Sequence, residues 1–216
     1  MDQTLFYLIN QQWTNPILDL FMAAISNIEI WKPLIAVLVL WALILGRFKG
    51  RALILCLGLA LVVNANLTSG LKKFVDRRRP KQVERVRMIE LSKARPEFLT
   101  VFKPVKIRYS DVRDRTRSGP SFPSGHVTNN VTIAVILSFF FRRWGWLYFL
   151  LAGAIAWSRV YLGAHWPSDV AATFFLAAGA TALMLALFET LYRWAAAKWA
   201  PQFFLRHPRL VDDAIA

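Results

Sequence analysis

Three short clusters hold most of the residues whose types and spacing could do chemistry. They are 72–80 (KKFVDRRRP), 123–126 (PSGH) and 158–169 (SRVYLGAHWPSD). Two of the chain's three histidines, His126 and His165, lie in these clusters, and Asp169 follows His165 by four residues. A carboxylate beside an imidazole orients the ring and makes it more basic. Because Asp169 precedes an apolar run, where an unpaired carboxylate is costly, we expect it to pair with His165.

The residues around both histidines predict helix N-termini. Pro167 suits the first position of a helix, which would leave His165 just outside that helix and Asp169 in its first turn. Ser124 is typical of an N-cap, with Gly125 and His126 opening the next helix. Helix N-termini offer free N–H groups and partial positive charge, and this environment favours a phosphate ligand.

The clusters also contain three cations that could hold phosphoryl oxygens. These are Lys72, Arg79 and Arg159, and a guanidinium can bind two oxygens at once. Phosphoryl transfer needs positive charge around the equatorial oxygens, an in-line nucleophile and a proton for the leaving group. One histidine can attack while the other donates the proton. Since no carboxylate cluster accompanies the histidines, we predict a phosphatase that uses neither a metal ion nor another cofactor.

The composition indicates that membrane helices position these clusters. Of 216 residues, 56% are hydrophobic and 19% are charged, against about 45–50% and about 25% in ordinary soluble domains. Five segments approach the length of about 20 residues that a spanning helix needs. They are 31–46, 52–70, 126–141, 144–163 and 170–191.

We therefore expect an all-α integral membrane bundle of five to six transmembrane helices, with its active site at one membrane face. Residues 1–216 would form one domain. The N-terminal part, 1–30, would be amphipathic or partly inserted, and its apolar stretch 17–25 is the possible sixth span. The segment 71–125 would be a basic loop outside the membrane, and 200–216 a polar tail at the surface.

Alternating spans would bring the three clusters to one membrane face. The short turns 47–51 and 142–143 are basic and would share the opposite face, which the positive-inside tendency makes cytoplasmic. We therefore expect an inner-membrane protein whose site faces the periplasm or cell exterior. Of the net charge of +14, the segment 72–117 supplies +10. Beside a bilayer, such a segment favours lipid headgroup phosphates over nucleic acid.

The clusters resemble the pattern of the type 2 phosphatidic acid phosphatase (PAP2) superfamily, K-x6-RP, then PSGH, then SR-x5-H-x3-D. Every fixed position of that pattern is matched. The resemblance implies that His165 is a nucleophile that forms a phosphohistidine, that Asp169 orients it, and that His126 protonates the leaving oxygen and later activates water. The implied phosphate ligands are Lys72, Arg79, Ser124, Gly125 and Arg159. Pro123 and Ser158 would not contact the phosphate but would support the residues that bind it.

The resemblance leaves the substrate open among undecaprenyl diphosphate, phosphatidylglycerophosphate, phosphatidic acid and a lipid A phosphate. A lipid phosphotransferase would use the same residues. A protein that only binds anionic lipid is a further alternative, but it would not need both histidines. The spans argue against the larger, soluble vanadate haloperoxidases. We expect Lys73, Arg77 and Arg78 to be solvated or to face lipid, and the sequence predicts no oligomeric state.

Overall fold

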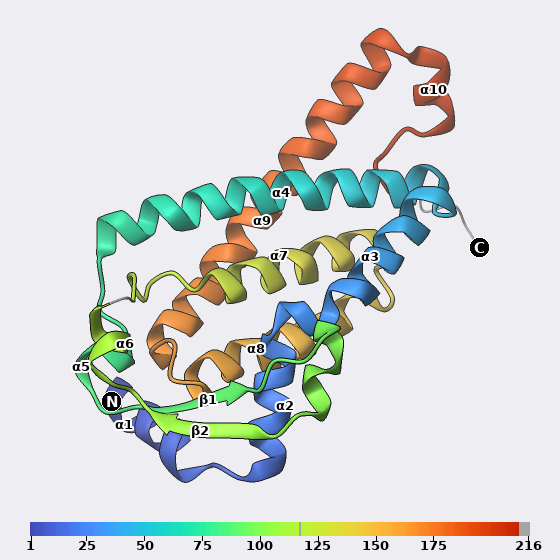
Figure 1. The fold of residues 1–216 in the computed structure, drawn as a ribbon. Coiled ribbons are helices and arrows are strands. Elements are labelled where there is room, and N and C mark those ends of the chain that lie inside the picture. Colours follow the sequence, from blue (N-terminus) through green and yellow to red (C-terminus); the bar gives the residue numbers. More distant parts are fainter. Residues whose placement is uncertain (117, 212–216) are drawn as a thin grey trace.

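The computed structural model describes residues 1–116 and 118–211, which are mostly helical (Figure 1). The helices are α1 (Asp2–Tyr7), α2 (Pro16–Ser26), α3 (Ile28–Ile44), α4 (Arg47–Val75), α5 (Pro80–Val83), α6 (Val112–Thr116), α7 (Gly125–Phe140), α8 (Tyr148–Tyr161), α9 (Pro167–Trp199) and α10 (Pro201–Arg206). Leu8–Gln12 is a π-helical segment, and Glu97–Phe102 and Gly145–Leu147 are 3₁₀ turns. The strands are β1 (Arg87–Leu91) and β2 (Val105–Tyr109).

Helix α7 is the centre of the bundle and packs against α4, α8 and α9 (Figure 1). Its inward side chains Val127, Val131 and Ile136 are fully buried. By contrast, α3, α4 and α9 expose many large apolar side chains, such as Val37 and Phe175. Helices that are apolar on their outer faces fit a lipid surround, where exposure of such side chains carries no cost.

A buried polar contact fixes the three central helices relative to one another. The amide of Asn64 on α4 donates to the hydroxyls of Thr132 on α7 (2.7 Å) and Thr181 on α9 (3.0 Å). Both threonine hydroxyls also donate to the carbonyl four residues earlier in their own helix. Interhelical hydrogen bonds of this kind set the register of helices that have no hydrophobic driving force between them.

The number of spans predicted from the sequence is not confirmed. Within the described residues, α4 and α9 are each long and apolar enough to cross a membrane, and α2 with α3 would be a third span, bent by 50°. Helices α7 and α8, of 16 and 14 residues, are shorter than the usual spanning length. Helices do occupy all five predicted segments, so the apolar runs located them correctly.

The two basic turns lie together at the end of the bundle away from the start of α7. The ammonium of Lys49 lies over the ring of Phe141 at 5.1 Å, and Phe48 packs against Tyr192 of α9 at 5.8 Å. The chain after Trp199 also folds onto this end: α10 turns back (Figure 1), and Leu210 is buried. Residues 200–209 are mostly exposed, as expected for a surface tail, but Leu210 and Val211 are buried; residues 212–216 lie outside the described residues.

The long loop is not irregular, and the all-α prediction misses a β-hairpin within it. Strands β1 and β2 pair antiparallel, with Ile89 opposite Ile107 and Arg87 opposite Tyr109. The five prolines between 71 and 125 excluded one long helix but said nothing about strand pairing. Because the loop is ordered by its own pairing and side chains, it can hold residues at its two ends in fixed positions.

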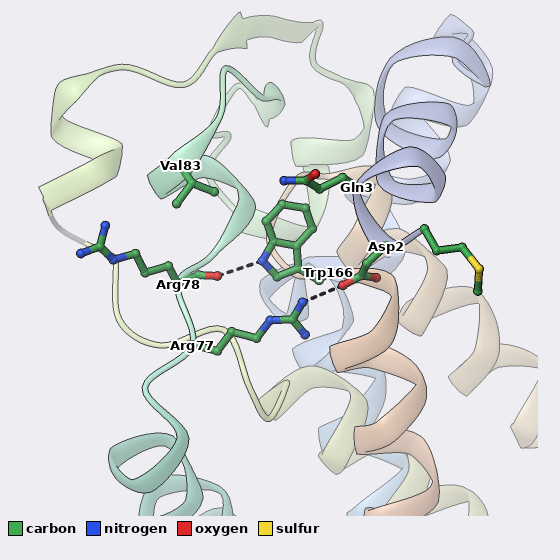
Figure 2. A pocket seen from close by; sticks show the side chains of 7 residues that line it. Asp2, Gln3, Arg77, Arg78, Val83 and Trp166 are labelled. Atoms are coloured by element: carbon green, nitrogen blue, oxygen red, sulfur yellow. Dashed lines mark hydrogen bonds and ion pairs between the residues drawn. The ribbon is translucent and has the colours of Figure 1, made fainter.

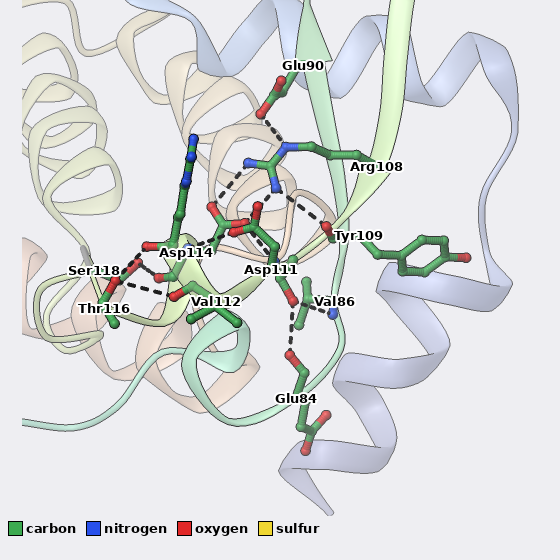
Figure 3. A network of polar contacts seen from close by, with 12 residues as sticks. Glu84, Val86, Glu90, Arg108, Tyr109, Asp111, Val112, Asp114, Thr116 and Ser118 are labelled. Atoms are coloured by element: carbon green, nitrogen blue, oxygen red, sulfur yellow. Dashed lines mark hydrogen bonds and ion pairs between the residues drawn. The ribbon is translucent and has the colours of Figure 1, made fainter.

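An ion-pair network ties the hairpin to α6 (Figure 3). Arg108 on β2 donates to Glu90 on β1 at 2.6 Å and makes two bonds to Asp114 on α6, at 2.5 and 3.1 Å. The Asp114 carboxylate also accepts from the backbone N–H of Asp111. The hydrogen bond from Arg108 holds the pKa of Asp114 well below its usual range.

A second, buried ion pair connects the hairpin to the N-terminal helices and to α8. Arg87 on β1 makes two bonds to Asp19 on α2, at 2.9 and 2.5 Å, and the hydroxyl of Tyr161 donates to the same carboxylate at 2.6 Å. Asn10 also donates to the carbonyls of Arg87 and Tyr161. The N-terminal segment therefore fastens the loop to the end of α8.

We expect Asp19→Ala to lower the free energy of unfolding by about 3–5 kcal/mol, since it leaves a buried guanidinium unpaired. Denaturant titration of the detergent-solubilised protein, followed by circular dichroism, measures the change. Lys32→Met is the matched control because it breaks only the exposed pair with Glu29. Equal stability of the two variants would contradict the anchoring role of the Asp19 ion pair.

Candidate active site

The structure brings the three sequence clusters together at one end of the bundle. The N–H of Ser121 donates to the carbonyl of Arg77 (2.7 Å), and the indole of Trp166 donates to the carbonyl of Arg78 (2.8 Å; Figure 2). The guanidinium of Arg79 donates to the carbonyl of Gly119 at 2.9 Å. The segments after α4, before α7 and before α9 are thus joined by direct hydrogen bonds.

His165 lies in a tight turn between α8 and α9. The N–H groups of Ala164 and His165 both donate to the carbonyl of Arg159, at 2.9 and 3.2 Å. The turn passes through Gly163 at φ +71°, a conformation that side chains with a Cβ rarely adopt. A Cβ at Gly163 would also lie 2.1 Å from Cγ1 of Val86. The glycine lets the ordered loop pack tightly beneath the turn that carries His165.

The sequence had led us to expect a direct pair of His165 with Asp169. In the structure a serine connects the two side chains instead. His165 is 2% exposed and Asp169 is 1% exposed. The hydroxyl of Ser121 donates to Oδ2 of Asp169 at 2.5 Å and lies 3.4 Å from Nδ1 of His165. With its proton given to Asp169, the hydroxyl can accept a hydrogen bond only from a protonated Nδ1. In this tautomer Nε2 is unprotonated.

Arg77 binds the other carboxylate oxygen of Asp169. Its Nη1 lies 2.5 Å from Oδ1. The Arg77 side chain is 38% exposed, so it is partly solvated as expected, but the sequence did not predict its ion pair with Asp169. A carboxylate this deeply buried needs a cation or several hydrogen bonds to remain charged. Arg78, by contrast, is exposed, in agreement with the expectation.

Three cations lie near both histidine rings. Lys72 at the end of α4, Arg79 and Arg159 on α8 all lie close enough to act electrostatically on His126 and on His165. Burial and the charges of Arg79 and Arg159 hold the pKa of His165 well below its usual value, so this ring is neutral at neutral pH. Such a concentration of positive charge is suited to an anion.

Two buried polar atoms at the site have no hydrogen-bond partner among the described residues: Nε of Arg159 and Oγ of Ser124. The guanidinium of Arg159 does donate through Nη1 to the hydroxyl of Ser26. Buried polar groups without partners are rare and costly in folded proteins. The free N–H of Arg159 and the hydroxyl of Ser124, together with the cations Lys72 and Arg79, could bind the oxygens of an anion.

The start of α7 differs in one detail from the sequence prediction. Ser124 occupies the N-cap position, but its side chain makes no capping bond, and its N–H donates to the hydroxyl of Thr173 on α9 (3.1 Å). The hydroxyl of Ser124, not its N–H, is therefore the group left for a ligand. Gly125 has nothing within 4 Å of the position of a Cβ, so this turn of helix is open.

The two residues expected to support the site, Pro123 and Ser158, are both buried. Pro123 is buried at the entry to α7. Ser158 is fully buried, and its hydroxyl donates to the carbonyl of Ile155 in its own helix at 2.6 Å. Ser158 therefore contributes to the packing of α8.

His126 borders an apolar cavity of about 300 Å³. Its walls come from α2, α3, α7 and α8, and they include Trp31, Ile35, Leu38 and Ile155. The hydroxyl of Tyr148 donates to Asn130 at 3.0 Å on the α7 side of the cavity. The cavity extends along α3, which is one of the helices with an apolar outer face.

A second cavity, of about 720 Å³, adjoins Arg159 on the side of the hairpin. Its lining is mixed: apolar side chains alternate with three carboxylates, from Glu29, Glu90 and Glu97, and with Lys93. Ser26 lines both cavities. The lining of this cavity is more acidic than the overall charge of the loop had suggested.

The sequence did not point to Ser121 or Ser26, and it led us to expect Arg77 to be solvated or to face lipid. Ser121 stands two residues before Pro123, but nothing in the sequence separates it from Ser118 or Ser110 nearby. Ser26 lies at the bend between α2 and α3, where the sequence placed no site residue. Only the three-dimensional arrangement brings these hydroxyls to the clusters.

Within residues 1–116 and 118–211, no group of three or more His, Cys, Asp or Glu side chains could hold a metal ion. The absence of a metal requirement remains a prediction. The arrangement offers instead an unprotonated imidazole nitrogen, a second histidine and three cations around an open helix N-terminus.

Similarity to known proteins agrees with this arrangement. The chain is 53% identical to YbjG of Escherichia coli (strain K12) over 51 residues, which is 23% of this chain and 26% of that protein. It is 29% identical to the lipid A 4'-phosphatase of Bacteroides thetaiotaomicron over 163 residues, which is 73% of this chain and 64% of that protein. Both matches cover less than two thirds of the relative's own length.

The fold is also similar to a solved structure. The crystal structure of Aquifex aeolicus LpxE matches with a TM-score of 0.59 and 25% identity, over 85% of this chain and 94% of that one. The sequence profile of the PAP2 superfamily matches residues 51–193, more than half of the chain, and this range includes all three clusters. The resemblance noted in the sequence is thereby confirmed, and the chain is an integral membrane protein that belongs to the PAP2 superfamily.

Proposed function

We propose that this protein is a lipid phosphate phosphatase that works through a phosphohistidine at His165. The observation that carries the proposal is the position of the neutral His165 ring among three cations, beside the unpartnered Nε of Arg159 and Oγ of Ser124. A phosphoryl group there would have its oxygens bound by fixed positive charge. Preorganised charge of this kind stabilises the transition state of phosphoryl transfer.

In the proposed first step, Nε2 of His165 attacks phosphorus while the bond to the lipid oxygen breaks. His126 must be protonated to give a proton to that oxygen. Burial and the nearby cations hold the pKa of this ring below its usual value, and the negative charge of the bound phosphate would offset them. In the second step His126 takes a proton from water, and the resulting hydroxide displaces His165 from phosphorus. Inorganic phosphate leaves, and both histidines return to their starting states.

The apolar cavity beside His126 is the proposed site for the start of the lipid tail. It lies between helices whose outer faces are apolar, so a chain could enter it from the bilayer. The phosphate would then lie at the membrane surface, at the end opposite the two basic turns. We propose that this end faces the periplasm of an inner membrane.

The cavity of about 720 Å³ beside Arg159 favours a substrate with a headgroup larger than phosphate alone. Glu29, Glu90 and Glu97 can accept hydrogen bonds from hydroxyl or amino groups. Among the four candidate lipids, a phosphorylated glycolipid such as lipid A offers the most donors. A prenyl diphosphate offers none beyond its phosphates, and it would leave this cavity unused.

Phosphate release by the detergent-solubilised protein tests the proposed function. We expect release from lipid phosphates, fastest from the glycolipid, and an unchanged rate in excess EDTA, because Lys72, Arg79 and Arg159 supply the positive charge. Loss of activity that a divalent ion restores would contradict the metal-free mechanism. Turnover only when an acceptor lipid is added would identify a phosphotransferase, and binding without turnover would overturn the enzyme assignment.

A further inference from the structure

Asp2 on α1 makes two polar contacts with Ser168 at the start of α9, 166 residues further along the chain, and a third with Arg77 in the segment after α4. Its carboxylate accepts from the N–H of Ser168 (2.9 Å), from the Ser168 hydroxyl (2.6 Å) and from Nη2 of Arg77 (2.7 Å; Figure 2). Burial raises the pKa of Asp2, but the hydrogen bonds from Ser168 and Arg77 outweigh burial, and the pKa lies below its ordinary value. Asp2 is therefore charged at neutral pH.

Arg77 is shared between two carboxylates. While Nη2 binds Asp2, Nη1 binds Oδ1 of Asp169 at 2.5 Å and the hydroxyl of Ser168 at 2.8 Å. The guanidinium also lies over the ring of Trp166 at 5.8 Å, and Phe6 of α1 packs on the same ring at 5.2 Å. The contacts with Asp2, Ser168 and Trp166 hold the Arg77 guanidinium in position against Asp169.

Because Arg77 binds both Asp2 and Asp169, it also affects the net charge next to His165. One guanidinium between two carboxylates leaves a net charge of −1, so Arg77 does not fully neutralise Asp169. The remaining oxygen of Asp169 accepts from Ser121, whose hydroxyl lies 3.4 Å from His165. Outer hydrogen-bond partners of this kind orient a reactive imidazole and raise its basicity.

We propose that Asp2 and Arg77 form a positioning pair, which orients the carboxylate of Asp169 and, through Ser121, the ring of His165. The proposal rests on the proposed function and extends it to α1, a helix that lies outside the matched family region. Neither residue touches the reacting atoms.

The charged groups that face His165 among the described residues determine the sign of the effect. Lys72 on α4, Arg79, and Arg159 on α8 act directly, and Asp169 on α9 acts through Ser121. Removing the charge of Asp2 lets Arg77 neutralise Asp169 and disfavours the imidazolium. Removing the charge of Arg77 does the reverse.

The test compares Asp2→Asn, Arg77→Gln and the conservative variant Asp2→Glu, each with its tag at the C-terminus. We expect Asp2→Asn to lower kcat/KM for phosphate release by about 10-fold and to move the acid limb of its pH profile to lower pH. Arg77→Gln should move that limb to higher pH, and Asp2→Glu should restore most of the rate. Thr4→Ala, at an exposed position of α1 outside the pocket that Asp2 and Arg77 line, is the matched control and should change nothing.

A readout independent of turnover separates this proposal from the proposed function. The titration of His165, followed by ¹⁵N NMR with His126 and His207 assigned by substitution, should shift in opposite directions in the two variants. Equal thermal midpoints would show that folding is unaffected. An unchanged His165 titration in Asp2→Asn would overturn the positioning pair, whereas an inactive wild type with the expected shifts would overturn only the phosphatase.

Discussion

Replacing His165 by alanine is expected to lower kcat for phosphate release by about 10³-fold or more. The residual rate would come from the cations and the helix N-terminus, which still bind the phosphate but have no nucleophile to offer it. Phosphate release from a lipid phosphate in detergent, measured under substrate saturation, gives this ratio. Because the His165 ring is buried, His165→Asn is a second variant that keeps a polar group there and should be equally inactive.

The matched control for this substitution is His207→Ala. His207 stacks on Phe48, with ring centroids 4.4 Å apart, at the far end of the bundle. It should therefore keep the wild-type rate. Activity close to wild type in both His165 variants, with normal thermal midpoints, would show that another group attacks phosphorus.

The second large effect is expected at Arg159. Arg159→Met should lower kcat/KM by about 10³-fold, since the guanidinium carries a buried, unpartnered Nε next to both histidines and is placed to stabilise the charge of the transferring group. Arg159→Lys keeps the charge but loses the planar fork, and its rate should fall between those of Arg159→Met and the wild type.

Arg78→Met is the control for charge alone. Arg78 is exposed, and its side chain points away from Trp166 and Asp2 (Figure 2). Its substitution removes one positive charge from the same end of the bundle, so the rate should change little. Equal losses in Arg78→Met and Arg159→Met would mean that the overall charge of the loop, rather than a specific contact, drives the reaction.

The sequence was sufficient to locate the helices and to bring the three clusters to one end of the bundle. Long apolar runs specify helices in a membrane protein, because every backbone group must be satisfied within the segment. The alternation of these helices then decides which loops meet. His126, His165 and Asp169, with Lys72 and Arg79, could be predicted because residue type and helix order were enough to place them.

The sequence was not sufficient to predict the contacts between loops. Ser121 became important because the segment before α7 pairs with the backbone of Arg77, and no periodic pattern reports such a contact. The sharing of Arg77 by two carboxylates depends on the path of α1 past the start of α9. The hairpin was missed because its strands are short and its stabilising pairs, such as Arg108 with Asp114, consist of charges that also suit a solvated loop.

The central claim, that His165 carries the phosphoryl group during turnover, can be tested by trapping. The protein is mixed with a lipid phosphate labelled in its phosphoryl group, quenched in alkali within the first turnovers, and digested for mass analysis. We expect label that is stable in alkali and lost in acid, on the peptide containing His165, and no label in His165→Asn. Steady phosphate release with no labelled peptide, or with label on a serine, would contradict the account.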